Sequence, residues 1–78
     1  FKALTLAQEL HKKGEKDAKV IRQRMVSLIN EEPLAKIDYV SVADQNTLEE
    51  LSTIDRPALV SLAVRIGRTR LIDNMLLG

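Results

Sequence analysis

The sequence predicts an α+β domain in which two helices pack on one face of a small, mostly antiparallel three-stranded sheet. Two observations predict this fold. Apolar residues recur at intervals of three and four as far as residue 30, and at intervals of two in the strand-like segments beyond residue 36. The 78 residues indicate a single domain, 1–78. Its core is expected to be marginal, because a chain this short buries only about 60% of its unfolded surface.

Residues 1–13 are predicted to form the first helix. Its apolar residues lie at steps of three and make one stripe: Phe1, Leu4, Ala7 and Leu10. Gly14 follows a basic last turn and is expected to end the helix with positive φ, which glycine adopts at little steric cost.

The next segment predicts a second helix, which runs from about Glu15 to Glu32. Glu15 and Asp17 supply the negative charge that a first helical turn favours. Pro33 is expected to stop the helix, because proline lacks a backbone donor and disfavours helical geometry in the residue before it. One face of this helix carries the apolar residues Ala18, Ile21, Met25, Leu28 and Ile29.

Residues 37–43 predict a strand, because they are rich in residues that favour β-structure. A turn is expected at residues 44–46. Asn46 and Glu49 then make a capping-box pattern, which predicts one or two helical turns over residues 46–51. Pro57 is expected to stand at the start of the next strand, where its missing donor does least harm.

Residues 58–66 are the strongest predicted strand, with two faces of different character. One face carries Val60, Leu62, Val64 and Ile66. The other is small or only partly polar, so we expect something to cover it in a parent protein; it carries Leu59, Ser61, Ala63 and Arg65. Gly67 begins a tight turn, and residues 70–77 return as the third strand. The sequence leaves open the exact register and the side on which the first strand pairs.

Composition excludes several classes of function. A net charge of +1 gives no long-range field to attract nucleic acid or an anionic membrane. The chain has no cysteine, which excludes disulfides and thiolate metal sites and is compatible with a reducing cytoplasm. His11 and Glu15 are expected to make a surface contact rather than a metal site. Four serines lack a His–Asp partner set for nucleophilic catalysis: Ser27, Ser41, Ser52 and Ser61.

Three arginines around the predicted turn form the most interesting polar cluster: Arg65, Arg68 and Arg70. One hypothesis is an anion clamp, which would make the chain a small anion- or nucleic-acid-binding module. The hypothesis that we favour is a solvated hairpin tip, with an ion pair from Arg65 or Arg70 to Asp73 across the strands. The chain has only one Tyr, one Phe and no Trp, so it lacks the aromatic side chains that usually stack on RNA bases.

Four stretches resemble, in order and spacing, the C-terminal domain of the pantoate–beta-alanine ligases (pantothenate synthetases): residues 38–44, 47–48, 56–59 and 63–74. The resemblance covers the whole chain. It is most specific in the final hairpin, whose sequence is AVRIGRTRLIDN. The chain also starts directly with helical periodicity and without a Met, so we expect it to be part of a longer protein.

The resemblance implies a C-terminal lid domain from a larger, two-domain cytoplasmic ligase. Such enzymes use ATP and Mg²⁺ to adenylate pantoate, pass the pantoyl group to β-alanine, and release AMP and pyrophosphate. The implied partner is an N-terminal nucleotide-binding domain, which carries a His-x-Gly-His motif and a loop with Ser-Arg-Asn. Neither motif occurs in this sequence. No catalytic, cofactor-binding or metal-binding residue is therefore assigned, and the fragment alone is expected to be inactive. A third hypothesis is a homodimer through the uncovered sheet face.

Overall fold

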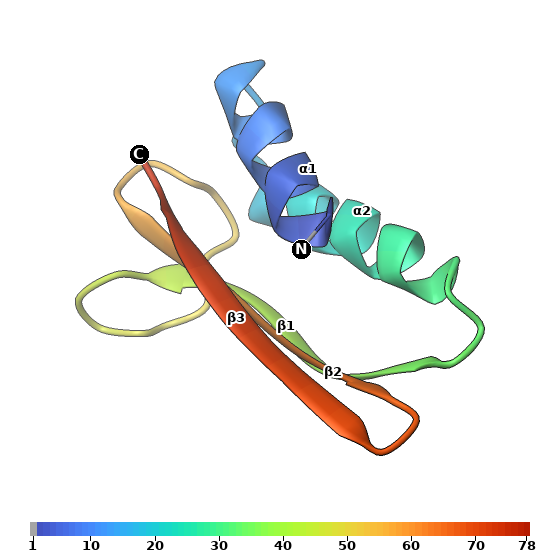
Figure 1. The fold of residues 1–78 in the computed structure, drawn as a ribbon. Coiled ribbons are helices and arrows are strands. Elements are labelled where there is room, and N and C mark those ends of the chain that lie inside the picture. The colour runs from blue at the N-terminus through green and yellow to red at the C-terminus, as the bar shows by residue number, and fades with distance from the viewer. Residues whose placement is uncertain (1) are drawn as a thin grey trace.

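The computed structural model describes residues 2–78, and Figure 1 shows how their five elements are arranged. The elements follow in the order α1 (Lys2–Lys12), α2 (Ala18–Asn30), β1 (Ala35–Asp44), β2 (Ala58–Ile66) and β3 (Thr69–Leu77). The strands form one antiparallel sheet in the order β1-β2-β3, and both helices lie on the same side of it. The predicted α+β fold is therefore confirmed. The first strand pairs with β2, on the side away from β3.

Both predicted helices are present, and the expected residues set their ends. Gly14 follows α1 with a φ of +96°. Asp17 caps α2, because its carboxylate accepts the backbone N–H of Lys19 at 2.9 Å and of Val20 at 3.4 Å. The helix ends at Asn30, just before Pro33. Phe1, the first residue of the predicted stripe, lies outside the described residues.

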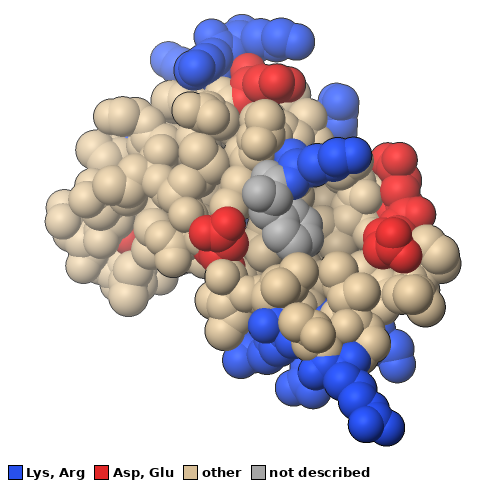
Figure 2. Space-filling view, in the orientation of Figure 1, with Lys and Arg blue, Asp and Glu red and all other residues tan. Residues whose placement is uncertain are grey.

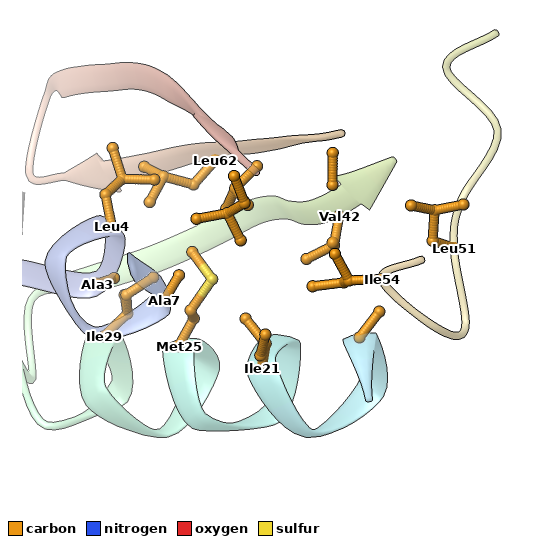
Figure 3. Packing of buried hydrophobic residues seen from close by; sticks show 14 of the residues in the cluster. Ala3, Leu4, Ala7, Ile21, Met25, Ile29, Val42, Leu51, Ile54 and Leu62 are labelled. Atoms are coloured by element: carbon orange, nitrogen blue, oxygen red, sulfur yellow. The ribbon is translucent and has the colours of Figure 1, made fainter. Parts of the chain in front are cut away.

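The core lies between the two helices and the inner face of the sheet, which is the face toward them (Figure 3). Figure 3 shows the side chains of Leu4, Ile21 and Met25 directed from the helices toward the strands. Val60, Leu62 and Val64 of β2 are fully buried on this face, so the predicted assignment of the two faces of β2 is confirmed.

The short helix predicted over residues 46–51 is wrong. The chain instead forms a turn in which Leu48 has a φ of +63°. The N–H of Glu49, which the capping-box pattern assigned to the Asn46 side chain, instead donates to the hydroxyl of Thr47 at 3.3 Å. Asp44, at the end of β1, accepts the N–H groups that begin the turn. One carboxylate oxygen of Asp44 accepts the backbone N–H of Asn46 at 2.7 Å and of Thr47 at 3.0 Å. The residue that organises this turn therefore lies upstream of the predicted cap.

Tertiary contacts hold the rest of the β1–β2 loop in an extended form. The N–H of Leu51 donates to the carbonyl of Val42 at 2.9 Å, so the loop continues along the edge of β1. Ser52 accepts the N–H of Ala18 at 3.0 Å, which joins the loop to the start of α2. The side chains of Leu51 and Ile54 are buried in the core. Burial and long-range pairing thus outweigh the weak local preference for a helix.

A two-residue turn joins β2 to β3, and it depends on Gly67, whose φ is +61°. Replacing Gly67 with valine is expected to lower the free energy of unfolding by about 1–2 kcal/mol, because side chains other than glycine are strained at positive φ. A Cβ atom at this position would meet nothing within 4 Å, so the loss would come from the backbone alone. Urea unfolding measures the effect. Gly67→Asn is the control and should lose less, since asparagine tolerates positive φ better; equal losses in the two variants would contradict this account.

Candidate functional site

Two of the three predicted arginines come together on the outer face of the sheet, opposite the helices. Arg65 of β2 lies directly across from Arg70 of β3. Both reach the same carboxylate oxygen of Asp38 in β1, with Nε···Oδ2 distances of 3.3 Å from Arg65 and 2.9 Å from Arg70. Arg68 lies in the turn itself and is exposed. The structure thus separates the tip arginine from an ion cluster formed by Asp38, Arg65 and Arg70.

The predicted ion pair with Asp73 is wrong, because Asp73 lies on the other face of the sheet. Asp73 pairs with Leu62, whose side chain points to the core, whereas Arg65 and Arg70 share the outer face. Asp38 takes its place. It lies at a β-bulge, which shifts the register of β1 between Ile37 and Tyr39. The sequence did not single out Asp38, because it leaves open how the first strand pairs with the second.

The ion cluster satisfies its own charges. The hydrogen bond from Arg70, helped by Arg65, holds the pKa of Asp38 below its usual value, so this carboxylate stays ionised near neutral pH. All three side chains are partly open to solvent, where ion pairs are weak because water screens them. The carboxylate already binds the Nε–H donor of each arginine. The cluster therefore needs no external anion to explain it.

A second polar cluster, which the sequence analysis did not single out, ties together the two ends of the β1–β2 loop. Nε of Arg56 lies 2.8 Å from Oδ1 of Asp55, and its Nη1 lies 3.4 Å from Oδ2 of Asp44. The other oxygen of Asp44 accepts the hydrogen bonds of the turn described above. The Asp44 residue is only 7% exposed. Its partners are all within the loop, so the role of this cluster is structural.

The free energy of unfolding is expected to fall as the pH drops below about 4. Backbone hydrogen bonds from Thr47 and Asn46 lower the pKa of Asp44, and hydrogen bonds from arginines lower those of Asp38 and Asp55. A carboxyl group whose pKa is lower in the folded state stabilises the fold above its unfolded pKa. That contribution disappears as the pH falls through the folded pKa. Urea unfolding at pH values from about 2 to 6 measures the trend.

Asp44→Ala is the variant that tests the part of Asp44 in this pH dependence. Its free energy of unfolding should fall less steeply with decreasing pH than that of the parent chain, because one of the three carboxyl groups with a lowered pKa is gone. A stability that does not change on acidification, or an Asp44→Ala variant as acid-sensitive as the parent, would contradict the assignment.

Glu50 links β1, α2 and the loop. Its Oε2 lies 2.9 Å from Nη1 of Arg22 and accepts the N–H of Val42 at 3.2 Å. Its Oε1 accepts the hydroxyl of Ser41. Ser41, one of the serines considered above, therefore donates to a structural carboxylate and has no catalytic base at that hydroxyl.

The side chains needed to hold a metal ion do not gather in the part of the chain that the structure describes. Residues 2–78 contain no group of three or more His, Asp or Glu side chains arranged to hold a metal ion. His11 and Glu15 were predicted to share a helix face, but α1 ends at Lys12, so Glu15 lies beyond the helix. The Glu15 carboxylate instead accepts the N–H of Asp17 at 3.3 Å. The same residues form no helix long and apolar enough to cross a bilayer.

A hollow of about 400 Å³ lies between the start of α1, the end of α2 and the sheet. Its walls are mostly apolar, and two carboxylates, Glu31 and Glu32, line it together with Lys2. Carboxylates repel phosphate groups at short range. This hollow therefore does not suit ATP.

On the face that Figure 2 shows, basic side chains gather mainly toward two opposite ends. One group extends beyond α1, and another extends from the end where β2 turns into β3. Uncharged surface covers much of the area between them. This face therefore does not present the continuous basic stripe that tracks a nucleic-acid backbone.

Comparisons with known proteins give a consistent result. The family model described as "Pantoate-beta-alanine ligase" matches residues 1–76. The chain is 55% identical over 78 residues to the pantothenate synthetase of Herpetosiphon aurantiacus, and covers 28% of that protein. It is 49% identical over 77 residues to the enzyme of Pelotomaculum thermopropionicum, of which it covers 27%. The alternative of an anion- or nucleic-acid-binding module is not supported by these matches.

The fold also matches a solved structure. The crystal structure of pantothenate synthetase from Thermus thermophilus matches 96% of this chain and 27% of that chain, with a TM-score of 0.85 and 27% identity. The chain thus spans a little over a quarter of the length of the relatives it matches. The same fold therefore occurs inside a much longer polypeptide. By its matching family model and its relatives, this chain belongs to the pantoate–beta-alanine ligase family.

Proposed function

We propose that this chain is the C-terminal lid domain of an ATP-dependent, AMP-forming ligase that makes pantothenate from pantoate and β-alanine through a pantoyl-adenylate. One observation carries the proposal. The chain belongs to the ligase family along nearly its whole length, yet spans only 28% of a relative such as the Herpetosiphon aurantiacus protein. The catalytic groups are then expected in the remaining part of the polypeptide, with the nucleotide-binding domain as the partner of this one. A cytoplasmic location is part of the proposal, and a chain without cysteine is compatible with it.

A closing domain suits this reaction. Water hydrolyses an acyl-adenylate, and a domain that closes over the cleft excludes water and completes the site. ATP would supply the adenylyl group and Mg²⁺ would neutralise charge, with the metal held by ligands from outside this chain, because residues 2–78 contain no group of His, Asp and Glu arranged to hold a metal ion. The contribution of this chain is a stiff cover: a three-stranded sheet supported from one side by two helices.

The isolated chain is expected to fold but to bind neither ATP–Mg²⁺ nor pantoate, and to form no pantothenate. Isothermal titration calorimetry with ATP and Mg²⁺ measures this directly, and unfolding by urea shows that the sample is folded. Binding with a dissociation constant of about 1 μM, or about −8 kcal/mol, would contradict the proposal.

The positive control is a chimera of the Herpetosiphon aurantiacus enzyme in which this chain replaces the matching segment, which is 55% identical. We call it the lid chimera. It should bind ATP–Mg²⁺ under the conditions in which the isolated chain does not. A lid chimera that folds without binding nucleotide would remove the support for a shared role.

A further inference from the structure

The face of the sheet opposite the helices, here called the outer sheet face, carries three uncharged rows of side chains. One row consists of Tyr39, Ala63 and Ile72, the next of Ser41, Ser61 and Asn74, and the third of Ala43, Leu59 and Leu76. Ile72 is 59% exposed and Leu76 is 55% exposed, whereas Ala63 is fully buried among its neighbours. Charged side chains flank this area: the ion cluster of Asp38, Arg65 and Arg70 lies beyond the first row, and Glu50 of the β1–β2 loop binds the hydroxyl of Ser41 along β1.

Among the described residues, no other face gathers as many of the large exposed apolar side chains. The inner sheet face is covered by α1 and α2. The solvent side of the helices is polar, with exposed residues that include Lys2, Gln8, Glu9, Lys12, Lys19, Gln23 and Arg24. The other large exposed apolar side chains lie apart: Leu34 before β1, Leu48 in the β1–β2 loop, and Leu71 on the inner face. Three of the six thus share the outer sheet face: Tyr39, Ile72 and Leu76.

The size of this face favours a tethered partner over a second copy of the chain. Neighbouring strands lie about 4.8 Å apart and residues on one face repeat about every 6.8 Å, so three strands and three rows span on the order of 300 Å². A stable dimer buries about 800 Å² on each partner. A domain of the same polypeptide needs less area, because its tether keeps the effective concentration high, at about millimolar for short linkers. Interfaces between domains of one chain bury upward of about 600 Å² in total, or about 300 Å² on each partner, and they permit relative motion.

We propose that the outer sheet face is the surface with which this domain packs on the remaining part of its own synthetase polypeptide. The proposal rests on the proposed function, because it takes the chain to be one domain of the longer enzyme. The relatives have the required length outside this region, since this chain covers only 28% of the Herpetosiphon aurantiacus protein and 27% of the Thermus thermophilus chain. Ile72 and Leu76 would be covered when the lid closes, while the ion cluster would lie at the edge of the contact.

Thiol labelling tests this proposal, because the chain has no cysteine of its own. Ile72→Cys places a thiol on the outer sheet face, and Leu34→Cys is the matched control, as Leu34 is also a large apolar residue and is 67% exposed. Labelling by a maleimide is followed in the isolated chain and in the lid chimera, with the host cysteines replaced and with ATP, Mg²⁺ and pantoate present. Unfolding midpoints of the isolated variants verify folding, and Leu76→Cys replaces Ile72→Cys if the latter does not fold.

The thiol at position 72 is expected to react at least about tenfold more slowly in the lid chimera than in the isolated chain, as for a domain that is closed about 90% of the time. The thiol at position 34 should react at the same rate in both. Equal rates at position 72 would overturn the proposal. So would slow labelling of the isolated chain that becomes faster on dilution, since that would show a homodimer through this face.

Pantothenate formation by the lid chimera without cysteine substitutions separates this inference from the proposed function. An active chimera whose position 72 is unprotected overturns the docking face alone. An inactive chimera whose position 72 is protected overturns the proposed function and leaves the docking face standing. A chimera that is inactive and whose position 72 is unprotected overturns both the proposed function and the docking face.

Discussion

Replacing Leu62 with alanine is expected to lower the free energy of unfolding of the isolated chain by about 2–5 kcal/mol. Leu62 lies in the middle of the central strand β2, is fully buried, and faces α1 and α2 (Figure 3). The substitution removes apolar contacts and leaves a cavity that the surrounding sheet cannot close. Because small domains have total stabilities near the low end of about 5–15 kcal/mol, much of the variant could be unfolded.

Urea unfolding followed by circular dichroism measures this change. The matched control is Leu76→Ala, which truncates a leucine on the outer sheet face of β3 and is expected to change the stability by less than about 0.5 kcal/mol. A loss below that value for Leu62→Ala, or a larger loss for Leu76→Ala than for Leu62→Ala, would mean that the two faces of the sheet are reversed.

Removing this domain from the lid chimera is expected to lower the rate of pantothenate formation at least about 100-fold, the scale of effect produced by misplacing reacting groups. The reason is that the open cleft admits water and no longer holds the adenylate against the second substrate. The measurement is the steady-state rate with saturating ATP, pantoate and β-alanine.

The control for the deletion is the stability of the shortened protein, followed by its thermal unfolding. A shortened protein that stays folded and keeps the rate of the intact chimera would contradict the role of the domain as a cover. A shortened protein that is slow because it is unfolded is distinguished by its thermal transition.

Local signals predicted most of the fold. Apolar spacing identified both helices, and the ends of the second helix followed from Asp17 and Pro33. The strand predicted over residues 58–66 matches β2 from Ala58 to Ile66. Gly67 indicated the turn between β2 and β3, because its backbone conformation favours glycine. These features depend on residues close together in the sequence, and short-range patterns record them well.

The two incorrect predictions, the short helix and the ion pair with Asp73, both concern contacts between residues that are not close neighbours in the sequence. The segment 46–51 has a helical signature, but its backbone pairs with Val42 and Asp44 at the end of β1. Arg65 and Arg70 pair with Asp38, which lies in another strand, 27 and 32 residues before them in the sequence. A bulge and a long-range hydrogen bond leave little trace in the residue types themselves.

The individual residues did not indicate which reaction the protein takes part in, whereas the family resemblance suggested one. None of the polar clusters formed around Asp38, Asp44 or Glu50 offers a nucleophile with its base, and each has a structural explanation. The resemblance of the final hairpin to the pantoate–beta-alanine ligases is confirmed by the family match over residues 1–76. The order and spacing of the sequence stretches therefore identified the family.

The most direct test of a water-excluding cover is the amount of AMP released for each pantothenate formed. The lid chimera is expected to release about one AMP per pantothenate, because the closed domain protects the adenylate until β-alanine attacks it. After removal of this domain, AMP release should exceed pantothenate formation, since water then takes part of the intermediate. A ratio that stays at about one without the domain would contradict the account, because the intermediate would then need no cover from this chain.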